Sequence, residues 1–287
     1  MEFLPFAFCE SVCQILKTRE LSCVQRIRSD FWGKAAAEAS DRRVRLGITI
    51  SYNQQTWSYN LLHRQKTMTF DELQQVDLKH LQVTKVHIGS CPQQASSLEE
   101  ILEIVRFTIP FLCEPSMNIL HNNLSEEALT AILSLYRNAP IYSLCCFESK
   151  KPVEEYLKNQ LNSASPPTRL KIVLGGWSEE VRVAVEEFAI SKPFVSIRAC
   201  SDAFVFSKEF FERLFEKIPS STTLVYEFAG KFSFEFKELH GFKPEIQMAD
   251  QTTKFHCLKW RRVDGVAATV AYGEREKWYT VQFVSCK

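Results

Sequence analysis

The sequence lacks the patterns by which several large classes of protein are recognised. No apolar run approaches the roughly 18 residues of a membrane-spanning helix. The 35 basic side chains barely outnumber the 34 acidic ones, so no excess of positive charge points to a phosphate backbone. We therefore expect neither a membrane nor a nucleic acid as the principal partner.

The ten cysteines follow no metal-binding or disulfide pattern. No CxxC pair occurs, and no set of cysteines and histidines has the spacing of zinc ligands. Cysteines lie in apolar runs such as Ser143–Phe147, where a reduced thiol behaves as a small hydrophobe. The N-terminus carries Glu2 and has no basic n-region, unlike a secretory signal peptide. We expect ten reduced thiols, no metal ion, and a location in the cytoplasm or the nucleus.

No motif of catalysis or cofactor binding stands out. Gly175–Trp177 precedes a helix but lacks the lysine of a P-loop and the third glycine of a dinucleotide fingerprint, so we expect a tight turn. Pairs of glutamates are expected in first helical turns, where carboxylates favour the helix dipole. These pairs are Glu99–Glu100, Glu126–Glu127, Glu154–Glu155 and Glu179–Glu180. We expect no catalytic residue and no cofactor.

What the chain does contain is a repeated pattern of apolar run, polar turn, amphipathic helix and proline. The prolines that close the units lie 26 to 30 residues apart, at Pro110, Pro140, Pro166, Pro193 and Pro219. Serines mark the helix starts, at Ser97, Ser125, Ser149, Ser178 and Ser207. Such a period indicates stacked strand–helix units with parallel strands. We predict an α/β fold, either an irregular leucine-rich-like solenoid or an open parallel sheet, since the asparagine-bearing LxxLxLxxN pattern is absent.

The units on either side of the repeats differ in character. Val44–Ile50 and Thr56–Tyr59 are expected to form a hairpin, and Asp264–Gly265 is a strong turn signal between strands near the C-terminus. The predicted domains are a helical segment at 1–40, a connecting hairpin and helix at 41–82, the repeats at 83–230, and an antiparallel C-terminal cap at 231–287.

The helical N-terminal segment resembles the F-box. It has a leucine–proline start at Leu4 and Pro5, apolar positions on two helices, and a tryptophan near the end. It departs from that family at Cys13, where a large aliphatic residue is usual, and it lacks the valine before the tryptophan. The resemblance implies that a partner is bound by Leu4, Pro5, Val12, Leu16 and Trp32.

Together with the repeats, the phrases Leu4–Val12 and Phe70–Leu81 resemble the nematode-expanded families of F-box-associated proteins. That likeness implies a substrate receptor of a cullin–RING ubiquitin ligase. Its N-terminal helices would bind a Skp-type adaptor, and its repeats would hold an unidentified protein target. The leading expectation is therefore a non-enzymatic, protein-binding adaptor.

Two alternatives stay open. The first is a stand-alone repeat interaction protein whose F-box-like start has become structural packing. The second is a small enzyme with its site at the carboxyl ends of the strands. A pocket of convergent polar groups near Asn122, Glu148, Gly175 and Ser201 would favour the enzyme.

Overall fold

The computed structural model describes most of the chain, and every structural statement below concerns these residues. They are residues 5–16, 18–27, 29–52, 56–89, 95–120, 124–192, 194, 196–200, 204–217, 226–234, 245–248, 255–261, 266–273 and 279–285. The chain divides into two compact units, Met1–Pro115 and Ser116–Lys287. This division lies inside the repeat domain predicted at 83–230, after its first strand–helix unit.

The first unit begins with α1 (Phe6–Ile15), α2 (Thr18–Val24) and α3 (Asp30–Arg42). They enclose a small core made mostly of short side chains. Its buried members are Cys9, Cys13, Leu21, Ala35, Ala36 and Ala39. Alanines three and four residues apart on α3 allow close packing of the helices, which explains how so short a segment encloses a core. The expected helical character of this segment is confirmed.

The sheet of the first unit is mixed. Its strands are β1 (Val44–Tyr52), β2 (Trp57–His63), β3 (Lys66–Met68), β4 (Leu81–Ile88) and β5 (Ala95–Ser96). Strand β2 pairs antiparallel with β1, β3 and β5, whereas β4 runs parallel to β1. The hairpin predicted after residue 43 is therefore confirmed.

Short helical elements connect these strands. They are α4 (Phe70–Gln74), the 3-10 helix η1 (Leu78–His80), α5 (Leu98–Thr108) and the 3-10 helix η2 (Ile109–Phe111). The Thr69 side chain accepts a hydrogen bond from the backbone N–H of Glu72, whose carboxylate accepts one from the N–H of Thr69. Both groups are thereby satisfied at the start of α4.

The second unit alternates strands and helices as the proline spacing predicts. In chain order these are β6 (Leu112–Ile119), α6 (Glu126–Leu135), β7 (Ser143–Cys146), α7 (Lys151–Leu161), β8 (Arg169–Ile172), α8 (Glu179–Ser191), β9 (Ser196–Ala199), β10 (Val205–Phe206), α9 (Lys208–Lys217) and β11 (Tyr226–Phe232). The residues of β6 that pair with β7 begin at Ser116, within this unit. Strands β6, β7, β8, β9 and β11 pair in that order, and every pair is parallel.

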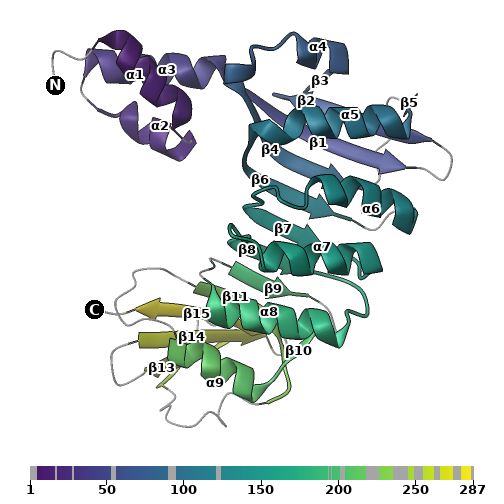
Figure 1. The fold of residues 1–287 in the computed structure, drawn as a ribbon. Coiled ribbons are helices and arrows are strands. Elements are labelled where there is room, and N and C mark those ends of the chain that lie inside the picture. Colours follow the sequence, from purple (N-terminus) through teal and green to yellow (C-terminus); the bar gives the residue numbers. More distant parts are fainter. Residues whose placement is uncertain are drawn as a thin grey trace. The chain divides into compact units, whose positions relative to one another are not determined.

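Helices α6, α7, α8 and α9 cover one face of this parallel sheet (Figure 1). Alternate strand residues face them and are buried, for example Leu144, Leu170, Ile197 and Phe228, which occupy one row of the register. A strand places successive side chains on opposite faces. The remaining strand residues therefore lie on the face that these helices leave uncovered.

Serine caps begin three of these helices. Ser125, Ser178 and Ser207 accept a hydrogen bond from a backbone N–H three residues later, at 3.2, 3.4 and 3.1 Å. Such a cap satisfies a backbone donor that has no partner within the helix. Each of these serines lies immediately before the first residue of its helix. These serines therefore mark the helix starts in the sequence.

A cluster of aromatic rings packs at the last parallel strands. The ring of Phe206 lies 5.0 Å from Phe204, 5.2 Å from Phe210 and 4.4 Å from Phe228, measured between centroids. A Cβ on Gly230 would lie 2.7 Å from the Phe206 ring. Glycine at 230 therefore makes room for an aromatic ring between β10 and β11.

Antiparallel strands follow the repeats. They are β12 (Glu245–Met248), β13 (Phe255–Arg261), β14 (Val266–Gly273) and β15 (Tyr279–Ser285). Consecutive strands pair antiparallel, and β15 joins the parallel sheet by pairing antiparallel with β11. The predicted α/β class is confirmed as a mixed, largely parallel, unclosed sheet. The solenoid, the F-box-like nature of the N-terminal helical segment and the bounds of the four predicted domains stay predictions.

Candidate functional site

The residues predicted to bind a partner are only partly brought together. Leu4 lies outside the described residues. Pro5 is exposed, and Val12 is half-buried. Leu16 and Trp32 are also half-buried and pack against the small core of α1, α2 and α3. Pro5 and Val12 are thus at the surface of α1, while the other two residues take part in holding the helices together.

Three large apolar side chains that were not predicted as site residues are exposed in this helical segment, two on the helices and Ile27 between α2 and α3. Phe8, Ile27 and Phe31 have exposed fractions of 48%, 50% and 50%. The Phe8 ring packs edge-to-face on Trp32 at a centroid distance of 6.3 Å. Pro5, Phe8 and Val12 are spaced by three and four residues, which places them on one face of α1. The buried positions of α1 are instead occupied by Cys9 and Cys13.

A buried arginine joins this helical segment to the sheet that follows. Arg43 is 3% exposed, and its Nη2 donates to the carbonyl oxygens of Cys13 at 3.0 Å, Gln14 at 3.3 Å and Leu16. These carbonyls lie at the end of α1, where a helix leaves acceptors unpaired and where its dipole favours a cation. Burial lowers the pKa of Arg43. The contact fixes the end of α1 against the start of β1.

The uncovered face of the second unit is polar and carries several positive charges. One row of the register on this face contains Ser143, Arg169, Ser196 and Glu227, and the row two residues further along contains Cys145, Lys171 and Arg198. Arg169, Lys171 and Arg198 are exposed. Most of these side chains line a hollow of about 290 Å³. Positive charge therefore surrounds an open depression on the sheet.

The charges on this face differ in their pairing. Arg198 donates to Glu227 at 2.5 Å. Arg169 and Lys171 have no carboxylate within ion-pair distance among the described residues. Their cationic groups instead lie over aromatic rings, Arg169 over Tyr142 and Lys171 over Phe147, each at 5.8 Å from the centroid. A ring face attracts a cation without neutralising its charge.

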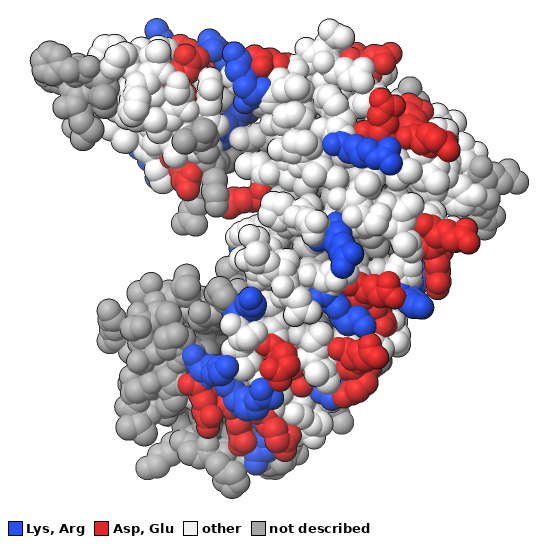
Figure 2. All heavy atoms as spheres, viewed as in Figure 1, with Lys and Arg blue, Asp and Glu red and all other residues white. Residues whose placement is uncertain are grey.

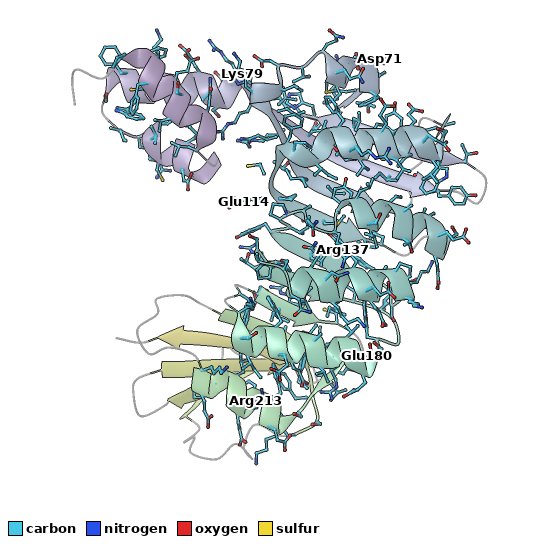
Figure 3. The ribbon with its side chains drawn as sticks, viewed as in Figure 1. Asp71, Lys79, Glu114, Arg137, Glu180 and Arg213 are labelled. Atoms are coloured by element: carbon cyan, nitrogen blue, oxygen red, sulfur yellow. The ribbon has the colours of Figure 1, made fainter. Side chains whose placement is uncertain are left out.

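The helix-covered side has a different electrostatic character. Acidic residues gather where α6 and α8 begin (Figure 2), at Glu126, Glu127, Glu179 and Glu180. Ion pairs join neighbouring helices, such as the 2.7 Å pair of Lys158 on α7 with Glu180 on α8; Glu180 is labelled in Figure 3. The expected placing in first turns is confirmed for these glutamates and for Glu99 and Glu100, whereas of the pair Glu154–Glu155 only Glu154 lies in a first turn.

One carboxylate and one glycine shape the turn before α8. Burial acts to raise the pKa of Glu154, but hydrogen bonds from Ser149 and Ser178 outweigh it and lower that pKa. The Ser178 hydroxyl donates to Glu154 at 2.6 Å. Gly175 has φ +107°, and a Cβ there would lie 2.8 Å from the backbone nitrogen of Ser149. The positive φ and the close approach of Ser149 explain why glycine occupies position 175, in the tight turn that we expected.

The described residues give little support to a catalytic site. They contain no group of three metal-binding side chains. Burial raises the pKa of Cys145 to about 11, with Lys171 acting against this shift. A thiol with that pKa is protonated near neutral pH and is a poor nucleophile. Two of the positions that would favour an enzyme, Asn122 and Ser201, lie outside the described residues.

A second hollow lies between α6 and α7 on the helix-covered side. It encloses about 170 Å³ and is lined by Thr130, Leu133, Ser134, Arg137, Pro152, Glu155, Tyr156 and Asn159. These side chains contain one cation and one carboxylate, so the hollow has no charge preference. Its volume is well below the range of about 300–1,000 Å³ that is usual for small-molecule sites.

In the described part of the chain, every helix is too short or too polar to cross a lipid bilayer. The chain was also compared with family models, curated proteins and solved structures, and none of them matches it.

Proposed function

We propose that this chain is a non-enzymatic adaptor that binds other proteins. The observation that carries the proposal is the polar sheet face of β7, β8, β9 and β11, which the helices of the second unit leave uncovered. An open sheet face with mixed charged and small polar residues offers a broad, shallow contact area. Enzymes usually place convergent polar groups in a deeper, largely apolar pocket. A protein target suits the observed surface better than a small substrate.

We further propose that the N-terminal helices bind a Skp-type adaptor, as the F-box resemblance implies. The exposed side of α1 with Pro5, Phe8 and Val12 supports this role, together with the neighbouring Phe31 and Trp32. Exposed apolar side chains on a small helical segment are typical of an interaction site, because a bound partner removes their surface from water and this is favourable. The contact with the adaptor would thus include Phe8 and Phe31 in addition to the residues predicted from the motif.

The proposal is tested by binding purified Skp-type adaptor to the full chain. The double variant Phe8→Ser, Phe31→Ser should lose adaptor binding and keep the melting temperature, because both side chains are half exposed and lose little packing. The matched control is Leu174→Ser, Val183→Ser, which removes exposed apolar side chains in the second unit (61% and 46% exposed). No binding by the unmodified chain would refute the adaptor role of the helices.

One observation favours the alternative of a stand-alone interaction protein. Leu16 and Trp32, two of the residues that an F-box would use, are engaged in the core of α1, α2 and α3. In that case no Skp-type adaptor would bind to the unmodified chain or to the Phe8→Ser, Phe31→Ser variant. The target-binding role of the sheet face is common to both possibilities.

A further inference from the structure

We infer that the uncovered sheet face around Arg169, Lys171 and Arg198 binds an extended acidic segment of the target protein. The inference rests on the proposed protein-binding function and adds the chemistry of the target. It follows from the charge, the spacing and the pairing of these side chains.

Charge complementarity identifies the partner as acidic. The hollow of about 290 Å³ is bordered by three cations and one carboxylate, Glu227. Glu227 is already engaged by Arg198 at 2.5 Å and by the Ser196 hydroxyl at 3.4 Å. Arg169 and Lys171 have no acidic partner among the described residues, so they can bind the carboxylates of another chain at little cost.

The spacing of the cations matches an extended peptide. Arg169 and Lys171 are two residues apart on β8, which separates their positions by about 6.6 Å along the strand. An extended peptide repeats its side chains on one face at the same interval. Arg198 is in register with Lys171 on the adjacent strand β9 and widens the positive area. A segment with acidic residues at alternate positions therefore fits this face.

The surroundings keep the cations available. The guanidinium of Arg169 and the ammonium of Lys171 rest over Tyr142 and Phe147, both at 5.8 Å. This arrangement spreads the two side chains over the surface and limits their freedom before binding, which lowers the entropy lost when a partner binds. Ser143 and Ser196, both half-buried, provide short hydroxyl groups between the charges.

A nucleic acid fits this face less well. Its affinity depends on many phosphate contacts, and two unpaired cations on one strand supply few. The net charge of the whole chain is only +1. A peptide with a few carboxylates needs no more positive charge than this face provides.

The test measures binding of a fluorescein-labelled peptide with four Glu-Gly repeats to the full chain, by fluorescence anisotropy at low ionic strength. The Gln-Gly version of the peptide is the uncharged probe. We expect binding of the glutamate peptide only, weakening with added salt. The variant Arg169→Gln, Lys171→Gln should bind it about tenfold more weakly, since each exposed ion pair corresponds to up to about fivefold in affinity and two are lost.

A matched control and an opposite change sharpen the test. Arg137→Gln, Lys151→Gln removes one arginine and one lysine that are exposed on the helix-covered side (Arg137 is labelled in Figure 3), so it has the same net charge as the first variant. It should bind the peptide almost as the unmodified chain does. Glu227→Gln should bind it several-fold more tightly, because it removes the competing carboxylate and frees Arg198.

Several results would overturn the inference. They are an absence of binding, equal binding of both peptides, equal loss in the two double variants, or weaker binding by Glu227→Gln. Tighter binding of a single-stranded oligonucleotide, lost in Arg169→Gln, Lys171→Gln, would assign the face to nucleic acid instead. Binding of the Skp-type adaptor is measured on the same samples. It should be unaffected by these variants, so the adaptor role and the acidic target can fail separately.

Discussion

Replacing Arg43 by methionine should destabilise the N-terminal helices selectively. Methionine keeps much of the length and the apolar volume of arginine but donates no hydrogen bond. The carbonyl oxygens of Cys13, Gln14 and Leu16 then lose the donor that satisfies them at the end of α1. The free energy that holds α1 against the start of β1 should fall accordingly.

The size of the effect follows from two opposing contributions. A hydrogen bond from a charged donor contributes about 1.5–3 kcal/mol, and the two N–H groups of Arg43 Nη2 are shared among three carbonyl oxygens. Burial of the guanidinium costs several kcal/mol in return, and its Nη1 has no hydrogen-bond partner among the described residues. A net loss of about 2–4 kcal/mol remains.

Hydrogen exchange of peptides from α1 in the full chain measures this loss. If exchange occurs through opening of the helices, their protection should fall by about 30- to 900-fold. Arg42→Met is the control, since the Arg42 side chain is 51% exposed and forms ion pairs with Glu10 and Glu38. It should change protection by less than about fivefold. Equal effects of the two variants, or greater protection in Arg43→Met, would refute the reasoning.

Three further predictions concern the second unit and the thiols. Gly175→Ala should lower the free energy of unfolding by more than about 1 kcal/mol in urea denaturation, because its φ of +107° and the nearby backbone nitrogen leave no room for a Cβ. Gly176→Ala, with no atom within 4 Å of the added Cβ, should be nearly neutral, and equal effects would contradict the turn geometry. The lowered pKa of Glu154 should stabilise the fold above its ordinary pKa of 4.5, and this contribution should disappear as the pH falls below that value. In urea titrations at several pH values, Glu154→Gln should therefore reduce the fall in the free energy of unfolding below pH 4.5. An unchanged fall would contradict this role of Glu154. Iodoacetamide should modify the exposed Cys23 well before the buried Cys146, whose pKa burial raises, as peptide mass spectrometry can show; simultaneous modification would contradict the burial.

Local signals predicted most of the strand–helix alternation. Ser97, Ser125, Ser178 and Ser207 cap helices at the predicted positions. A cap works through a backbone group three residues away, so the sequence contains the whole interaction. Ser149 is the exception: α7 is preceded by Lys150, and the Ser149 hydroxyl donates to Glu154 instead. Glu154 also accepts a hydrogen bond from Ser178 before α8, so the partner of Ser149 depends on how α7 packs beside α8.

The surface positions were harder to predict from the sequence. Phe8 and Cys9 are adjacent on α1, and hydrophobicity alone favours burial of the larger side chain. The structure buries Cys9 and Cys13, because α1 packs closely on the alanines of α3, and leaves Phe8 exposed. The charged face around Arg169 was also missed. Its residues are far apart in the sequence and meet only through the register of separate strands.

The contacts of α7 with both neighbouring helices set a limit on how this chain can change in length. Gln160, near its end, donates to the carbonyl oxygens of Tyr136 and Arg137 just after α6, at 3.2 and 3.0 Å. Glu154, near its start, accepts from Ser178 before α8. Removing the strand–helix pair that contains α7 would leave Tyr136, Arg137 and Ser178 without these partners. The strands on either side would still run parallel to each other. Gain or loss of whole repeats during evolution should therefore be tolerated at the ends of the array and selected against at its centre.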